Sequence, residues 1–190
     1  LKPGAARNAL DCALWDLEAK KEGKPVWQLL NLKEPKPTIT AYTISLSNPA
    51  KMMQDAKSKS DYPILKIKLG GQDDEKCIKA VREGSPNSRI IVDANEGWNI
   101  ESYNYLVPIF KSIGVELIEQ PFPSNKDHLL KNLDRKIPIC ADESCHDVKS
   151  LEKLVGLYDY INIKLDKTGG LTEAINLLQA AKKSGFKIML

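Results

Sequence analysis

Residues 63–71 read PILKIKLGG, a run of apolar and β-branched residues that stops at a Gly-Gly pair. Such a run is typical of a buried β-strand. Side chains alternate along a strand, so Lys66 and Lys68 point to one face while the leucine and isoleucine side chains between and beside them point to the other. Two lysines on one face of an otherwise buried strand indicate either that this face is hydrated or that it holds two ammonium groups for a chemical purpose.

Apolar runs of this kind recur along the chain and alternate with amphipathic helical patterns, such as those over 52–59 and 171–183. The seven runs that we predict to be strands are Thr38–Ser45, Ile64–Leu69, Ile90–Ala94, Leu117–Gln120, Ile137–Ala141, Tyr160–Leu165 and Phe186–Leu190. Strands and helices that alternate with short loops predict a parallel α/β fold. The even spacing favours a (β/α)8 TIM-type barrel that is incomplete here, with about seven strands.

The two ends of the sequence predict that it is part of a longer protein. It begins at Leu1 rather than Met, and a helical pattern over 4–21 precedes the first predicted strand. It stops on the strand-like residues 187–190. Because a complete barrel takes about 250 residues, we expect the eighth strand to lie beyond the C-terminal end.

The composition predicts one globular domain in the cytoplasm. The 190 residues are 42% hydrophobic, enough for a core, and the net charge of +3 comes from mixed-sign segments, which predicts no nucleic-acid partner. The sequence contains no apolar run of membrane-spanning length and no signal peptide, so we expect no membrane partner. Cys12, Cys77, Cys140 and Cys145 lack CxxC spacing and predict reduced, mostly buried thiols.

Five ionisable residues lie at or near the C-terminal ends of successive predicted strands. They are separated by 25, 26, 23 and 22 residues and are Lys68, Asp93, Glu119, Asp142 and Lys164. In a barrel, that end of the strands carries the active site, so the five side chains are expected to converge on one pocket. A solvated face explains them poorly, because barrel strands are covered by helices outside and by packed side chains inside.

The chemistry of these residues indicates proton transfer beside a metal ion. Asp93, Glu119 and Asp142 are hard oxygen ligands without neighbouring Cys or His, a set that suits Mg²⁺ or Mn²⁺. A lysine among other cations and apolar walls has a lowered pKa and can act as a base. Lys68 and Lys164 are then predicted to remove and return a proton α to a carboxylate, through an enediolate that the metal stabilises. Lys66 would lower the pKa of Lys68 and bind the substrate carboxylate.

Five motifs in this order resemble the enolase superfamily, in its muconate-lactonizing subgroup. They are Lys66-Ile67-Lys68, Asp93-Ala94-Asn95, Glu119-Gln120-Pro121, Ala141-Asp142-Glu143-Ser144 and Asn162-Ile163-Lys164. The stretch ARNALDCALWDLEAK over 6–20 and the following PVWQLL also resemble the segment that joins that family's capping domain to its barrel. The resemblance implies that residues 1–31 are the C-terminal part of an α+β capping domain and that 32–190 hold barrel strands 1–7. Asn31 stands where the family usually has Gly, and Asn also adopts the left-handed conformation.

Within the subgroup, TAYTISL over 40–46 and INIKLDKTGGLTEA over 161–174 look most like dipeptide epimerases of the L-Ala-D/L-Glu type. The resemblance implies that Lys68 and Lys164 are the catalytic acid/base pair. It also implies that Thr43 and Lys66 contact the substrate, a small carboxylate such as a dipeptide. For Thr43, ordinary strand packing is an equally good interpretation. The three carboxylates would hold the Mg²⁺, and a homo-oligomer stays open.

Other residues near these motifs have two interpretations each. Asn95 and Glu143 either orient the metal ligands and bases or are solvated strand ends. Thr168-Gly169-Gly170 either cradles an anion or makes a tight turn. Trp98 either walls the site or covers a loop. For Cys140 we favour a buried structural thiol, and for the two histidines, His128 and His146, exposed surface positions.

Several other functions use the same kind of site. N-acylamino acid racemase, o-succinylbenzoate synthase and muconate cycloisomerase stay open within the same chemistry. A Schiff-base aldolase that uses Lys164 is a more remote alternative, because an imine needs no set of three carboxylates. An inactive barrel is the non-enzymatic alternative. Little or no activity is expected from these 190 residues alone, because unpaired sheet edges are a liability.

Overall fold

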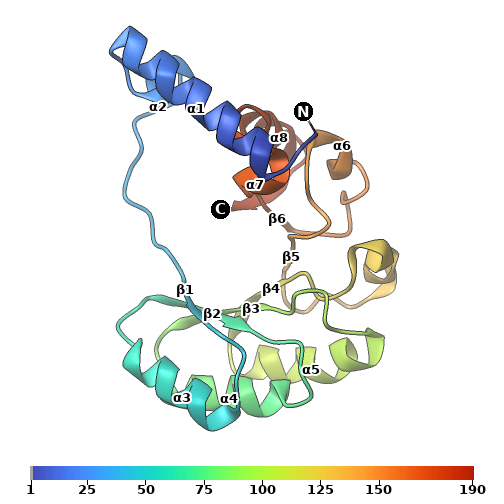
Figure 1. Cartoon of the computed structure of the whole chain (residues 1–190). Helices are drawn as coiled ribbons and strands as arrows, with labels where there is room; N and C mark the ends of the chain where they lie inside the picture. Colours follow the sequence, from blue (N-terminus) through green and yellow to red (C-terminus); the bar gives the residue numbers. More distant parts are fainter. Residues whose placement is uncertain (1) are drawn as a thin grey trace.

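The computed structural model describes residues 2–190, which form one parallel sheet of seven strands with helices outside it (Figure 1). Neighbours in the sheet are neighbours in the chain, from β1 to β7. The strands are β1 Tyr42–Ile44, β2 Ile64–Lys68, β3 Arg89–Asp93, β4 Val115–Glu119, β5 Ile139–Ala141, β6 Tyr160–Asn162 and β7 Lys187–Met189. The sheet curls into a half-barrel, which confirms the prediction of an incomplete (β/α)8 barrel.

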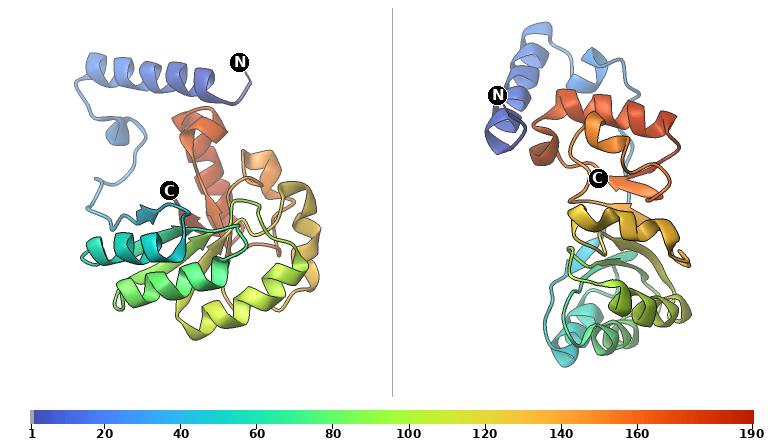
Figure 2. Two further views of the ribbon diagram at one scale, coloured as in Figure 1. Left: turned by 60° about the horizontal axis from the view of Figure 1, so that its bottom comes forward. Right: turned by 90° about the vertical axis from the view of Figure 1, so that its right-hand side faces the viewer.

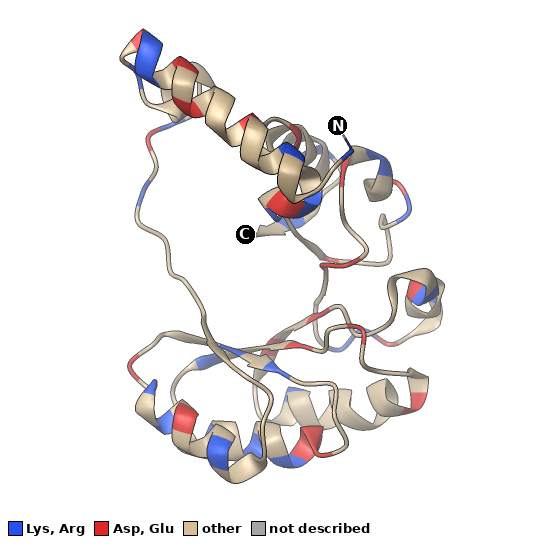
Figure 3. Cartoon of the chain, in the orientation of Figure 1, with Lys and Arg blue, Asp and Glu red and all other residues tan. Residues whose placement is uncertain are grey.

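The helices are α1 Ala5–Glu22, α2 Val26–Leu29, α3 Pro49–Ser58, α4 Asp74–Gly84, α5 Ile100–Ser112, the 3-10 segment η1 Ser124–Asn132, α6 Val148–Leu151, α7 Leu165–Thr168 and α8 Leu171–Lys183. The helices that follow the strands lie on the convex side of the curl, whereas α1 and α2 lie beyond α7 and α8, away from the sheet (Figure 2). Basic and acidic residues are mixed along the outer helices (Figure 3). Among residues 2–190, no helix is both long and apolar enough to cross a membrane.

The alternation predicted for 63–71 decides which face of β2 meets the helices. Leu65 and Ile67 are fully buried and belong to one apolar cluster with Met52 of α3 and Val81 of α4. Burial of such side chains contributes about 1.5–3 kcal/mol each. The lysines between them occupy the opposite, concave face. The hydrophobic core therefore lies between sheet and helices, and the concave face is left for polar side chains.

Two predicted strands are shorter than their apolar runs by three residues or more. The run Thr38–Ser45 is a strand only over Tyr42–Ile44, and residues 32–41 have no regular structure. Pro35 and Pro37 stand just before this run, and proline fixes φ and offers no N–H to a ladder. The run Tyr160–Leu165 ends as a strand at Asn162, because Leu165 already begins α7.

Candidate active site

Four of the five predicted residues stand at the carboxyl edge of adjacent strands. Lys68, Asp93 and Glu119 are the last residues of β2, β3 and β4, and they lie in register across the sheet. Asp142 follows the last residue of β5. Residues in register on parallel strands project to the same face, so the even sequence spacing becomes one row of charged groups.

The three carboxylates of this row form a compact, buried cluster. One oxygen from each of Asp93, Glu119 and Asp142 lies within 4.8 Å of the other two. The residues are 0%, 1% and 2% exposed. Burial raises the pKa of Glu119, and the negative charge of Asp93 raises it further. Carboxylates held this close need positive charge between or beside them.

The cluster fits a hard divalent cation by its donor chemistry and by one buried oxygen that accepts no hydrogen bond within residues 2–190. Oε2 of Glu119 is buried and accepts no hydrogen bond of normal geometry from the described residues. The Lys66 ammonium forms an ion pair with it at 2.5 Å. Three carboxylate oxygens without sulfur or imidazole donors are what Mg²⁺ or Mn²⁺ prefers.

Lys66 and Lys68 both reach the cluster from β2. The Lys66 ammonium also lies 2.9 Å from Oδ2 of Asp93, and Lys68 donates to the same oxygen at 2.7 Å. Burial lowers the pKa of Lys66, but the carboxylates of Glu119 and Asp93 outweigh burial and hold its pKa above the usual value. The two lysines of PILKIKLGG are therefore partners of buried carboxylates rather than hydrated surface groups.

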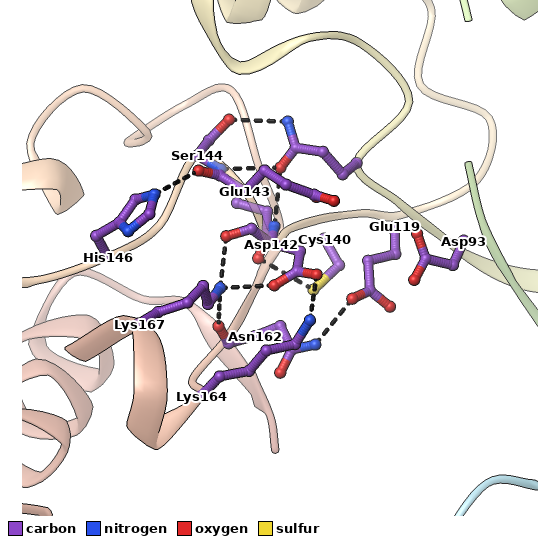
Figure 4. A network of polar contacts seen from close by, with 12 residues as sticks. Asp93, Glu119, Cys140, Asp142, Glu143, Ser144, His146, Asn162, Lys164 and Lys167 are labelled. Atoms are coloured by element: carbon purple, nitrogen blue, oxygen red, sulfur yellow. Dashed lines mark hydrogen bonds and ion pairs between the residues drawn. The ribbon is translucent and has the colours of Figure 1, made fainter. Parts of the chain in front are cut away.

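Lys164 approaches the other end of the cluster. It follows β6, stands immediately before α7, and its ammonium donates to Oδ2 of Asp142 (Figure 4). Burial lowers the pKa of Lys164, but the hydrogen bond and charge of Asp142 outweigh burial and raise it. The lowered lysine pKa expected from the sequence is therefore wrong for Lys164 in this arrangement, because its nearest partner is a carboxylate rather than a cation.

Lys167 is a residue that the sequence analysis missed. Its ammonium donates to Oδ1 of Asp142 at 2.6 Å, to the Asp142 carbonyl at 2.5 Å and to the Asn162 carbonyl at 2.9 Å (Figure 4). The pKa of Asp142 is lowered, because Lys164 and Lys167 together outweigh the effect of burial. A signal was present: Lys164 and Lys167 are three residues apart in a helical turn, a spacing that places side chains together.

Neighbouring amides complete the polar contacts of the cluster. Asn162 donates to Oε1 of Glu119 at 2.8 Å. Asn95 accepts from Lys68 at 2.8 Å and donates to Glu143 at 3.2 Å, so the two residues predicted to support the site form a chain that ends on Lys68. Thr43 is exposed on β1 in register with Lys66, and therefore shares its face.

A second missed residue, Gln120, fixes the backbone around Asp142. Its side-chain oxygen accepts from the N–H groups of Asp142 at 2.9 Å and Ser144 at 3.1 Å. Its amide nitrogen donates to the Phe122 carbonyl at 3.0 Å and to the Tyr158 hydroxyl at 3.0 Å. Gln120 is fully buried and has φ of 36°, a left-handed conformation that points the amide across to the next loop.

Asp74 holds the loops that follow β2 and β3. Its carboxylate accepts from the Gly71 N–H at 2.9 Å, from Gly70 N–H at 3.0 Å and from the Trp98 indole at 2.8 Å. Gly70 has φ of 122°, and a Cβ there would lie 3.0 Å from the Ala94 carbonyl oxygen. Trp98 is buried, and its contact with Asp74 places it against the loop that follows β2, in agreement with the loop-covering interpretation.

The cysteines and histidines stay outside the cluster's chemistry. All four cysteines are free thiols, and Cys140 is fully buried on β5, as expected. Burial, followed by the charges of Glu119 and Asp142, raises the pKa of the Cys140 thiol. A buried thiol of raised pKa is a poor nucleophile. His128 and His146 are exposed, as predicted.

Comparison with known families places these features in a wider context. Residues 49–190 match the family described as Enolase C-terminal domain-like. Residues 1–31 match the family described as Mandelate racemase / muconate lactonizing enzyme, N-terminal domain. The first match covers well over half of the chain.

Individual relatives align over nearly all of the chain. It is 46% identical to an N-acetyl-D-glutamate racemase of a Pseudoalteromonas species and 42% identical to the L-Ala-D/L-Glu epimerase of Escherichia coli. Each alignment covers 100% of this chain and 60% of the relative, so the chain spans little more than half of their length.

A solved structure also matches nearly all of the chain. The crystal structure of an enolase family member from Agrobacterium tumefaciens superposes with a TM-score of 0.95 at 50% identity, over 99% of this chain and 58% of that one. That protein is described as having homology to dipeptide epimerases, and its structure holds bound sodium and L-Ala-L-Glu.

Proposed function

The chain belongs to the enolase superfamily, and from that premise we propose that the complete protein inverts an α-carbon beside a carboxylate by proton transfer between two lysines. The observation that carries the proposal is the placement of Lys68 and Lys164. Lys68 contacts Asp93 at one end of the carboxylate row, and Lys164 contacts Asp142 at the other. Two bases on either side of one anchored carbon can serve its two faces.

Each of this chain's groups has a distinct part in the proposal. Lys68 or Lys164 removes the α-proton as the neutral amine, and the other lysine, as the ammonium, returns a proton to the opposite face. Lys66 and Thr43 bind the substrate carboxylate from neighbouring strands. Asn95, supported by Glu143, holds Lys68 in place. Mg²⁺ or Mn²⁺ on Asp93, Glu119 and Asp142 would supply the positive charge that stabilises the enediolate.

We propose an N-acylated glutamate as substrate, in the form of an L-Ala-D/L-Glu dipeptide. The two relatives named above act on N-acetyl-D-glutamate and on L-Ala-D/L-Glu. In both compounds an acyl group, acetyl or alanyl, is joined to the glutamate nitrogen. The dipeptide is favoured by the L-Ala-L-Glu in the Agrobacterium structure. An N-acylamino acid racemase is the second candidate, favoured by the Pseudoalteromonas relative.

The domain division follows the same proposal. Residues 1–31 would belong to a capping domain and 32–190 to the catalytic barrel. The family match over 1–31 supports this division, and the match over 49–190 agrees with it.

Proton NMR of the complete protein in D₂O tests the proposal. With Mg²⁺, L-Ala-L-Glu should lose its glutamyl α-proton signal and form L-Ala-D-Glu, and EDTA should stop both. Lys68→Ala and Lys164→Ala should each abolish epimerisation, whereas Lys76→Ala should not, because Lys76 pairs with Asp73 on the surface. If only N-acetylglutamate is turned over, the proton-transfer chemistry stands and the acyl group of the proposed substrate becomes acetyl instead of alanyl. If neither compound loses its α-proton, the proposal is overturned.

A further inference from the structure

The N-terminus of α8 is capped by a residue that lies 161 positions from the one it contacts in the chain. Its own N-cap residue is Gly170, which has no side chain to accept a hydrogen bond. The carboxylate of Asp11 in α1 takes that role: Oδ2 accepts from the Thr172 N–H at 3.0 Å and Oδ1 from the Thr172 hydroxyl at 2.7 Å. An acidic group at a helix N-terminus is favourable for both its hydrogen bonds and its charge.

The Gly169-Gly170 pair is explained by the same contact. A Cβ on Gly170 would lie 2.4 Å from Cβ of Asp11, and a Cβ on Gly169 would lie 2.9 Å from Cα of Pro3. Both distances are shorter than any tolerated contact, so only glycine lets α1 approach this closely. The sequence left an anion cradle and a tight turn open here. In the structure the N–H groups of Gly169 and Gly170 donate to the Leu165 carbonyl, so the pair makes a tight turn, and the Asp11 carboxylate binds at Thr172 instead.

The side-chain hydrogen bonds that attach α1 to the rest of the chain are made at this contact. The helix has no buried residue. Among residues 2–190, every side-chain hydrogen bond from α1 to another element ends on Thr172, including one from the Trp15 indole at 2.9 Å to the Thr172 hydroxyl. We call Asp11, Trp15, Gly170 and Thr172 the Asp11 latch.

The latch is one helical turn away from Lys164. Lys164 is the N-cap of α7, and its carbonyl accepts from the Thr168 N–H at 3.0 Å. The N–H groups of Gly169 and Gly170 both donate to the Leu165 carbonyl at 2.9 Å. The buried Thr168 hydroxyl donates to the Gly170 carbonyl at 3.0 Å. This compact turn leaves little freedom between the latch and Lys164.

We propose that the Asp11 latch positions Lys164, so that the docking of α1 sets the placement of one of the two bases. The proposal rests on the proposed two-base function. Lys68 is placed by β2 and by Asn95, which do not involve α1. Asp11 is therefore a positioning residue for one face of the substrate and not for the other.

The test measures α-proton exchange in D₂O separately from each epimer of the substrate, with the complete protein. The Lys164-dependent epimer is the one whose exchange Lys164→Ala abolishes. Asp11→Ala should slow exchange from that epimer about fivefold, the size of a lost helix cap, and leave the other epimer within about twofold. Thr172→Val should act in the same direction, because it keeps the backbone N–H but loses the hydroxyl. The matched control is Asp16→Ala, which removes an exposed carboxylate of α1 that pairs with Lys20.

Hydrogen–deuterium exchange by mass spectrometry gives a readout that does not depend on activity. Asp11→Ala should increase exchange in the peptide that spans 165–172 and leave the 66–74 peptide unchanged. Equal slowing of both epimers, or no change in either, would overturn the proposal. If no substrate loses its α-proton at all, the two-base function fails. In that case, unchanged amide exchange in the 165–172 peptide of Asp11→Ala would show that the latch fails too. Increased amide exchange there would show that the latch still orders this turn.

Discussion

Replacement of Gln120 by methionine tests how the backbone around Asp142 is held. Methionine has nearly the volume of glutamine but cannot make the hydrogen bonds of the amide. Three backbone groups would lose a partner: the Asp142 N–H, the Ser144 N–H and the Phe122 carbonyl, now bonded at 2.9, 3.1 and 3.0 Å. The Tyr158 hydroxyl would keep its bond to Asp127 at 2.6 Å.

The size of the effect follows from these three groups. A buried backbone group without a partner costs about 1–2 kcal/mol where the surrounding loop can relax a little. Gln120→Met should therefore lower the free energy of unfolding by about 3–6 kcal/mol, a large part of the roughly 5–15 kcal/mol typical of a folded protein. The left-handed backbone adds nothing to this difference, because both residues carry a Cβ.

Urea denaturation of the complete protein, followed by circular dichroism, measures this loss. Gln179→Met is the matched control: the same chemical change at an exposed position of α8 should alter the free energy of unfolding by less than about 0.5 kcal/mol. Gln120→Glu keeps the oxygen that accepts from the Asp142 and Ser144 N–H groups. It replaces the donating amide with a second acceptor oxygen beside the Phe122 carbonyl and Asp127, so it should be at least as destabilising as Gln120→Met. A loss below about 1 kcal/mol for Gln120→Met would refute the reasoning.

Three further predictions concern other contacts. Asp74→Ala should shift Trp98 fluorescence to the red and lower the free energy of unfolding by about 1–3 kcal/mol, because the buried Trp98 indole and the loop N–H groups of Gly70 and Gly71 lose their acceptor; an unchanged spectrum would contradict this. Burial raises the pKa of Asp11, but hydrogen bonds from Thr172 outweigh burial and lower it. The stability that the Asp11 carboxylate supplies should therefore be complete above its unfolded pKa of about 3.9 and disappear as the pH falls through the lower folded pKa. The free energy of unfolding of Asp11→Asn should accordingly approach that of the unchanged protein as the pH falls from 5 to 3. Thr43→Val should raise KM several-fold with little change in kcat if Thr43 binds substrate, whereas unchanged kinetics would indicate ordinary packing.

The strand-end residues were predictable from sequence because a barrel repeats one simple rule. Each βα unit places its last strand residue at the same edge, so spacing alone brought Lys68, Asp93 and Glu119 together. Lys164 was found by the same rule, although it lies beyond its strand. The rule fails at the first run, where prolines stand just before the run and β1 is short.

The supporting residues were not predictable in this way, because their partners are distant in the sequence. Gln120 contacts Ser144 and Tyr158, which lie on different loops. Asp11 contacts Thr172 across the whole barrel segment. Spacing within one element contains no information about such pairs. The raised pKa of Lys164 was also missed, because it depends on how close Asp142 lies.

The central claim is that two lysines serve opposite faces of one α-carbon. The most direct measurement is α-proton exchange in D₂O from separate L-Ala-L-Glu and L-Ala-D-Glu, with Lys68→Ala and Lys164→Ala variants of the complete protein. The account predicts a complementary pattern: each variant loses epimerisation but still exchanges the proton of one epimer, and the two variants spare different epimers. Exchange of the same epimer by both variants, or full epimerisation by either, would contradict it.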